Sequence, residues 1–186
     1  MRRFAVLLIA LALLPGCKFL KGKSKDTIEP PAKLVEFEKS LDVRQLWSVK
    51  TGDGVARTGA RPRPSFSNDQ IYVTDVDNGL IAYSASSGKR VWSMESEERL
   101  VSGTDARDGL VVAGSIDGLV IAVDANSGQE RWNSRVSSEL LVAPVIAGDV
   151  IVVRSNDGRV HGLSSADGSR IWQFDRGSPL ISLRGN

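Results

Sequence analysis

The sequence predicts an all-β protein built as a β-propeller, with about three four-stranded blades in 186 residues. Trp92, Trp132 and Trp172 recur at intervals of 40 residues, and each closes a similar series of short apolar runs. Within each series, an Asp/Gly turn separates two β-branched runs, and a second turn ends on glycine. A period of about 40 residues with several short strands per unit is typical of propeller blades.

Each unit is expected to contribute four strands. The two middle strands are the apolar runs 71–73 and 81–83, 111–112 and 121–123, and 152–153 and 160–163. A short inner strand should lie just ahead of each pair, where Pro64, Thr104 and Pro144 occupy equivalent positions. Proline suits such a place because it is tolerated at the start or the edge of a sheet. The fourth strand is expected to end on the tryptophan of its unit.

Aspartates mark the hairpin between the two middle strands of each unit. Asp77, Asp117 and Asp157 stand at equivalent turns, each followed by a glycine within two residues. Such sequences favour the positive φ angles of tight hairpins. A calcium-binding or catalytic role for these carboxylates is the alternative, but no oxygen-rich loop with the spacing of a calcium site surrounds them. They are therefore interpreted as turn residues.

The tryptophans are interpreted as packing residues between blades. One aromatic residue per blade at a constant register favours packing over stacking on a planar cofactor, and we expect each indole N–H to reach a backbone carbonyl. Trp47 opens a Trp-Ser-Val stretch like the Trp-Ser-Met stretch at Trp92, although no matching strands precede it. Trp47 is therefore counted with the repeat.

The N-terminus has the pattern of a cleaved secretory signal over residues 1–16. Arg2 and Arg3 provide the positive region, and residues 4–14 form an apolar run that is too short to span a bilayer comfortably. Cys17, the only cysteine, follows Gly16 directly, and this junction resembles the lipobox of bacterial lipoproteins. The resemblance implies that Cys17 is lipidated; the alternative is a free cysteine behind an ordinary signal peptide.

Residues 17–40 are expected to form a lipidated N-terminus and a flexible tether, and residues 41–186 a partial propeller. Lipoproteins of this kind with Asp after the cysteine tend to stay at the inner membrane. Lys18 therefore indicates a lipid anchor at the periplasmic face of the outer membrane. Several acyl chains on Cys17 would hold the protein firmly, because two hydrophobic signals already suffice for stable attachment.

The charge of the mature chain argues against a nucleic-acid partner. Removal of residues 1–16 takes away Arg2 and Arg3 and no acidic residue, so 22 basic residues remain against 22 acidic ones. Nucleic-acid binding requires a surplus of Lys and Arg gathered into a patch. No such patch is expected beyond the lysines near Cys17.

The second repeat resembles the units of quinoprotein-type propellers. Residues 122–132 read Ala-Val-Asp-Ala-Asn-Ser-Gly-Gln-Glu-Arg-Trp, which is similar to the family pattern Ala-x-Asp-x-x-Thr/Ser-Gly-x-x-x-Trp; Ser84 and Ser164 replace the Asp in the other copies. Together with a lipobox and a short polar tether, the repeat resembles the BamB family, the outer-membrane lipoproteins of the β-barrel assembly machinery. That family is eight-bladed, so the chain is expected to be the N-terminal portion of a longer protein.

The resemblance to the BamB family also implies a docking segment. Residues 180–185, Leu-Ile-Ser-Leu-Arg-Gly, are similar to the Leu-Ser-Leu-Arg-Gly segment of that family. Its partner-binding residues correspond to Ile181, Leu183 and Arg184, with Ile181 standing where leucine is usual. The resemblance implies docking on the POTRA repeats of BamA and assistance to unfolded outer-membrane proteins. A plain connector between blades is the alternative.

A periplasmic quinoprotein-like dehydrogenase is the enzyme alternative. Such enzymes, as a family, use an adjacent disulfide and a catalytic Asp with calcium ligands, whereas the only cysteine here is assigned to lipid. His161, the one histidine, stands where the other units have Ile81 and Ile121, and is interpreted as a packed or half-exposed side chain. The sequence shows no nucleophilic set, metal-spaced cluster or phosphate-binding glycine loop. We therefore expect a non-enzymatic scaffold without cofactor or metal.

A glycan- or peptidoglycan-binding lipoprotein is a third alternative.

Overall fold

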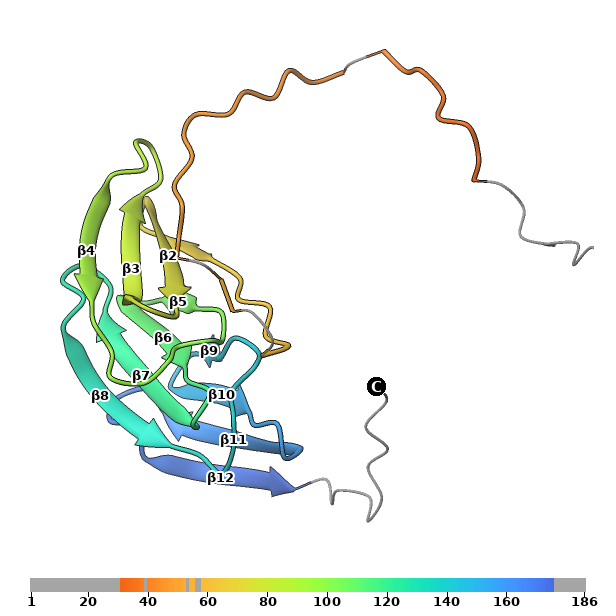
Figure 1. The fold of residues 1–186 in the computed structure, drawn as a ribbon. Helices are drawn as coiled ribbons and strands as arrows, with labels where there is room; N and C mark the ends of the chain where they lie inside the picture. Colours follow the sequence, from red (N-terminus) through yellow and green to blue (C-terminus); the bar gives the residue numbers. More distant parts are fainter. Residues whose placement is uncertain (1–30, 39, 53, 56–57, 176–186) are drawn as a thin grey trace, which may run out of the picture. The chain divides into compact units, whose positions relative to one another are not determined.

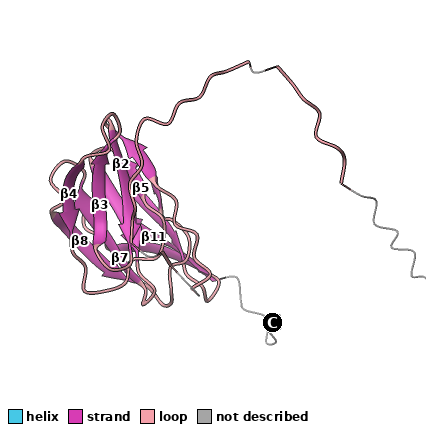
Figure 2. Ribbon diagram, turned by 45° about the horizontal axis from the view of Figure 1, so that its top comes forward, coloured by secondary structure: helices cyan, strands magenta, loops and turns pink. Residues whose placement is uncertain are grey.

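The computed structural model describes residues 31–38, 40–52, 54–55 and 58–175. The chain divides into two units, Met1–Val43 and Arg44–Asn186. The described residues of the first unit are exposed and contain no helix or strand. In the second unit the described residues form strands and loops only (Figure 2). Nowhere in the described part of the chain is there a helix long and apolar enough to cross a membrane.

The second unit contains three antiparallel sheets of four strands each, which confirms the predicted all-β blades. The first sheet comprises β1 (Ser65–Ser67), β2 (Gln70–Asp75), β3 (Gly79–Ser84) and β4 (Arg90–Met94). The second comprises β5 (Asp105–Arg107), β6 (Leu110–Gly114), β7 (Leu119–Asp124) and β8 (Glu130–Arg135). The third comprises β9 (Val145–Ala147), β10 (Val150–Arg154), β11 (Arg159–Ser164) and β12 (Arg170–Asp175). Each sheet is a meander in chain order, and the sheets follow one another like blades (Figure 1).

The three-residue strands β1, β5 and β9 are the inner strands, and they lie next to one another, β1 beside β5 and β5 beside β9. Pro64, Thr104 and Pro144 each stand one residue before an inner strand, at its expected place but just outside it. The backbone N–H of Thr104 donates to the Arg63 carbonyl at 3.1 Å, which joins the start of the second blade to the segment leading into the first.

The outer strands continue beyond their tryptophans, so the prediction that each ends on its tryptophan is wrong. Trp92 pairs with Ala82, and the ladder then runs on through Ser93 to Met94 opposite Leu80. The other two blades extend in the same way. The reason is cross-strand pairing. The preceding strand starts at the hairpin between the two middle strands, and its first residues pair with the residues that follow the tryptophan.

Glycines occupy the turns that the sequence predicted. Gly79, Gly118 and Gly158 have φ angles of 83°, 86° and 89° at the hairpins between the middle strands. The first two blades also carry tight turns between the inner strand and its neighbour, at Asn68-Asp69 and Asp108-Gly109, with all four φ angles positive. Such Asn/Asp/Gly pairs are typical of two-residue hairpins, but these turns were not among those predicted from the sequence.

The core lies between the sheets. Alternate residues of the second blade point to opposite faces, so Val111 and Ala113 pack towards the first blade while Leu110 and Val112 pack towards the third. β6 is therefore buried at every position. A strand that is covered on both faces reads as a continuous apolar run, which explains the absence of simple alternation in its sequence.

Trp92 and Trp132 join consecutive blades, as predicted, and Trp47 contacts the first blade in the same way. The indole N–H groups of Trp47, Trp92 and Trp132 donate to the carbonyls of Ala85, Ala125 and Ser165 at 2.8–2.9 Å. Each acceptor belongs to the turn that precedes the outer strand of the following blade. The turn glycine lies against the same indole: a Cβ atom added at Gly168 would stand 2.4 Å from Cε3 of Trp132. Glycine is thus required at this turn for close approach as well as for its φ of 72°.

Candidate functional site

The residues to which the sequence assigned lipidation and docking lie outside the described residues. These are Cys17, Ile181, Leu183 and Arg184. The docking segment follows β12 in the chain, since Ile181 is the sixth residue after Asp175. Their roles therefore stay predictions.

β12, the strand that leads towards this segment, is exposed along its whole length. Three large apolar side chains contribute: Ile171, Trp172 and Phe174 are 54%, 41% and 58% exposed. The equivalent tryptophan of the second blade, Trp132, is covered by the turn at Gly168 of the next sheet, so this exposed face of β12 is of the kind that a following sheet covers in this fold. Arg159 forms an ion pair with Asp175 at the end of β12, which helps to hold the point where the chain leaves the blade.

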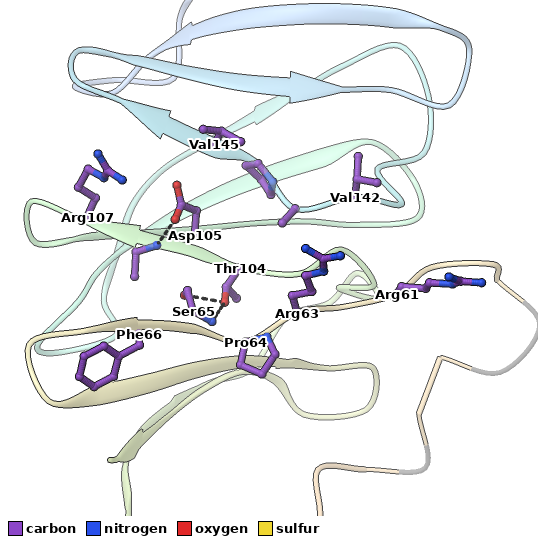
Figure 3. A pocket seen from close by; sticks show the side chains of 13 residues that line it. Arg61, Arg63, Pro64, Ser65, Phe66, Thr104, Asp105, Arg107, Val142 and Val145 are labelled. Carbon is purple, nitrogen blue, oxygen red and sulfur yellow. Dashed lines mark hydrogen bonds between the residues drawn. The ribbon is translucent and has the colours of Figure 1, made fainter. Parts of the chain in front are cut away.

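An open groove of about 800 Å³ runs along the inner strands. Its walls come from the first, second and third blades, with Ser65 and Phe66 on β1, Asp105 and Arg107 on β5, and Val145 on β9 (Figure 3). Arg61, Arg63 and Val142 line it from the segments before these strands. The groove thus brings residues of all three blades to one surface.

The groove is basic. Arg61, Arg63 and Arg107 are exposed, and their guanidinium groups make no ion pair with any carboxylate in the described ranges. The carboxylate of Asp105 is already engaged, because its Oδ2 accepts the Ile146 N–H at 2.7 Å and its Oδ1 accepts the Ala106 N–H at 3.0 Å. The expectation of no basic cluster rested on charges counted over the whole chain, whereas folding gathers these three arginines around one groove.

Side chains cap the backbone donors along the inner strands. The Ser65 N–H of β1 donates to Oγ1 of Thr104 at 3.1 Å, and the Ile146 N–H of β9 donates to Asp105. Thr104 is itself buried and donates to the Tyr72 carbonyl at 3.0 Å. The caps come from the neighbouring blade in each case, so they both link the blades and reduce the number of free donors that another strand could use.

His161 is buried at 1% exposure on β11, so the interpretation of a packed imidazole is correct. Its Nε2 lies 3.1 Å from Oγ of Ser155, and that hydroxyl donates to Asp157 at 2.5 Å. The serine proton is thus committed to the carboxylate, which leaves Nε2 as the donor to Ser155. Nδ1 then has no hydrogen-bond partner among the described residues. Burial lowers the pKa of His161, and the positive charges of Arg170 and Arg159 act in the same direction against the charge of Asp157.

This cluster does not have the geometry of a catalytic triad. In a triad the histidine takes the proton of an accessible serine, and the carboxylate orients the histidine. Here Ser155 is buried, and Asp157 accepts from the serine rather than from His161. Burial raises the pKa of Asp157, but hydrogen bonds from Ser137 and Ser155 outweigh it and bring the value to about 2. The carboxylate of Asp157 therefore has a structural role, because it accepts hydrogen bonds within its own hairpin turn.

Asp124, the aspartate of the repeat pattern, also has a structural role. Its Oδ1 accepts the backbone N–H groups of Asn126 and Ser127 at 2.9 and 3.0 Å, and Arg131 pairs with its Oδ2 at 2.5 Å. The hydrogen bond from Arg131 is the main reason that the pKa of Asp124 falls to about 2. Over the part of the chain that the structure describes, no group of three or more His, Cys, Asp or Glu residues could hold a metal ion.

The three four-stranded sheets, with Trp92 and Trp132 each linking one blade to a turn of the next, define a protein of the β-propeller class. The chain belongs to the family described as outer membrane protein assembly factor BamB, whose model matches residues 39–113 and 82–186. The resemblance drawn from the repeat at residues 122–132 is thereby confirmed.

Individual relatives agree with this assignment. The outer membrane protein assembly factor BamB of Xanthomonas campestris pv. campestris is 36% identical over 131 residues, which cover 62% of this chain and 32% of that protein. The crystal structure of BamB from Moraxella catarrhalis matches with a TM-score of 0.57 and 26% identity, over 61% of this chain and 35% of that one. The chain thus spans about a third of the length of these relatives.

The propeller fold is shared with enzymes. A quinohemoprotein alcohol dehydrogenase from Pseudomonas putida matches with a TM-score of 0.55 at 20% identity, covering 62% of this chain and 20% of the enzyme. At this identity the likeness shows a common fold alone.

Proposed function

We propose that the protein is a non-enzymatic lipoprotein scaffold of the outer-membrane β-barrel assembly machinery. One observation carries the proposal: the family of assembly factors matches the chain from residue 39 to residue 186, across all three blades. The blades also carry a basic groove along the inner strands, a surface suited to protein contacts.

Lipidation of Cys17 would hold the protein at the periplasmic face of the outer membrane. The segment between this residue and the blades includes residues 31–38, which are exposed and without helix or strand. Such a segment suits a tether because it can place the blades at varying distances from an anchor. Cys17→Ala should release the protein from the membrane fraction into the soluble periplasmic fraction.

Docking is assigned to Ile181, Leu183 and Arg184, with the POTRA repeats of BamA as the partner. The segment follows β12 in the chain. Aliphatic residues beside an arginine are suitable anchors, since arginine combines charge with a planar, weakly hydrated group. Assistance to unfolded outer-membrane proteins would follow from holding BamA and client near each other.

Co-purification with BamA tests this proposal. The double variant L183A/R184A should lose at least ~2 kcal/mol of binding free energy, the usual scale for one hot-spot residue. Its unfolding midpoint should match that of the parent protein, because a docking segment is expected to contribute to binding rather than to the packed core. A matched control, K89Q/R90Q, alters two exposed residues near the start of β4 and should co-purify normally. Normal recovery of L183A/R184A with BamA would reject this docking segment.

A further inference from the structure

We propose that the groove along the inner strands binds an extended acidic peptide segment of a partner protein, one that also carries apolar side chains. The inference concerns residues 61–66, 104–107 and 142–145 and does not depend on the docking segment after β12. It rests on the charges, the exposed apolar side chains, the capped inner edges and the dimensions of the groove.

The positive charge of the groove is complementary to a negatively charged ligand. Arg61, Arg63 and Arg107 make no ion pair within the described residues, and the one carboxylate between them, that of Asp105, is occupied by two backbone N–H groups. Arginine binds carboxylates through two parallel hydrogen bonds, which makes it well suited to aspartate and glutamate side chains.

The arginines stand at the two ends of the groove. Figure 3 shows Arg107 on one side and Arg61 and Arg63 on the other. The backbone hydrogen bonds agree, because the carbonyl of Arg63 accepts the N–H of Thr104 just before β5, and Arg107 is the last residue of β5. The strand between them is about 10 Å long. A ligand that meets both ends must therefore be extended, with acidic groups separated by roughly three residues of strand-like chain.

Apolar side chains lie between these charges. Phe66, Val145 and Val142 are 66%, 55% and 47% exposed where they line the groove. A small inorganic anion would leave these side chains in water, whereas a peptide with aliphatic or aromatic residues would cover them. The volume of about 800 Å³ lies within the range of ligand-binding clefts in proteins.

The inner edges of the sheets are not suited to pairing with a peptide as an additional β-strand. The Ser65 N–H is capped by Thr104, and the Ile146 N–H is capped by Asp105. A peptide that added itself as a further strand would need such donors free. Recognition in the groove is therefore assigned to the arginine and apolar side chains, and it should depend on ligand charge and hence on salt.

Fluorescence anisotropy with a labelled decapeptide of alternating Glu and Val tests the proposal on the full chain. Four unlabelled competitors are compared: the same Glu/Val decapeptide, a decapeptide of alternating Lys and Val, which should not compete, a decapeptide of alternating Glu and Ser, and a ten-residue oligothymidylate. The Glu/Val peptide should bind, and binding should weaken as salt is raised. The Glu/Ser peptide should compete less well, because it lacks apolar side chains.

Two double variants that remove equal charge test whether binding depends on the arginines of the groove. R63Q/R107Q should weaken binding of the Glu/Val peptide by roughly tenfold, because charged partners are removed from both ends of the groove. K89Q/R90Q removes the same amount of charge from exposed positions near the start of β4 and should leave the affinity unchanged. Phe66→Ser should weaken binding without changing its salt dependence. Should R63Q/R107Q alter the circular dichroism spectrum, the exposed single variant Arg61→Gln replaces it, with an expected loss of about threefold.

Equal affinity of R63Q/R107Q and K89Q/R90Q would overturn the proposal. Tighter competition by the oligothymidylate than by the unlabelled Glu/Val peptide would overturn it too, in favour of a nucleic-acid groove. Equal competition by the Glu/Ser and Glu/Val peptides would reject the apolar part of the assignment. None of these measurements involves BamA, so they are independent of the docking experiment.

Discussion

Two tryptophans at the same register of neighbouring blades have different surroundings. Trp132 on β8 is 7% exposed, whereas Trp172 on β12 is 41% exposed, although each pairs with a small residue of the strand inside it. The turn at Gly168 lies against Trp132, and the Ser165 carbonyl accepts its indole proton. Among the described residues no blade follows β12. The comparison teaches that an outer strand is buried by the following blade and not by its own sheet.

The same contrast holds for whole blades. The second blade is covered on both faces, one core cluster joining it to the first blade and another to the third. The third blade has one such face, and all six residues of β12 are exposed. Stability in stacked repeats depends on these neighbour contacts. We therefore expect equivalent substitutions in β8 and β12 to have unequal effects.

The largest expected effect comes from the buried tryptophan. Trp132→Ala should reduce the free energy of unfolding by about 3–5 kcal/mol, because it removes a large core side chain and the indole donor to Ser165. Trp172→Ala should cost less than about 1 kcal/mol, because that side chain is already partly in water. Urea unfolding followed by circular dichroism measures both. Equal losses would show that the tryptophans act within their own sheets.

Glycine turns allow a sharper version of the comparison. Gly168→Ala should cost roughly 2–4 kcal/mol, because the new Cβ adds strain at positive φ and also overlaps the Trp132 ring. Gly148→Ala, at a φ of 62° with nothing within 4 Å of the added atom, should cost about 1 kcal/mol from strain alone. Thermal and urea melts of the pair isolate the contact between blades. A larger loss for Gly148→Ala would contradict the close-packing role of the turn.

His161 makes the third blade sensitive to acid. Its pKa in the folded protein lies below the value of the unfolded chain, since burial disfavours the charged ring. Stability is therefore complete above the unfolded pKa of about 6.5 and falls as the pH drops towards the lowered folded value. Asp157 adds a similar loss only at lower pH, as the pH falls from its ordinary pKa of 3.8 towards about 2.

His161→Ile introduces the residue that the other blades have at this position and should remove the acid sensitivity below pH 6.5. Urea unfolding at a series of pH values from 7 to 4.5 measures this change. Ile121→His in the second blade is the matched control and should introduce the same pH dependence there. An unchanged pH profile in His161→Ile would assign the acid response to other groups.

The repeat could be predicted from the sequence because each blade carries its own copy of the pattern. Trp92, Trp132 and Trp172 set the spacing, and the packing argument correctly placed the indole N–H groups of Trp92 and Trp132 on backbone carbonyls. The ends of the outer strands could not be predicted, because they depend on pairing with residues such as Leu80 beyond the tryptophan. The inner strands are three residues long, which is too short for alternation to be visible.

The groove could not be predicted because its residues come from separate repeats. Arg63 and Arg107 are far apart in the sequence, and only the contact of β1 with β5 brings them to one surface. A hint was present, since Arg-Pro-Arg-Pro at residues 61–64 places two arginines just before an inner strand. A net charge summed over the chain concealed this local cluster.

Native-state amide hydrogen exchange tests most directly whether the following blade, rather than the sheet itself, protects an outer strand. The amides of β6 and β7 should exchange slowest, those of β8 should be well protected, and those of β12 should exchange fastest among the outer strands. Trp132→Ala should lower the protection of β8 towards that of β12. Equal protection of β8 and β12 in the unmodified protein would contradict the account.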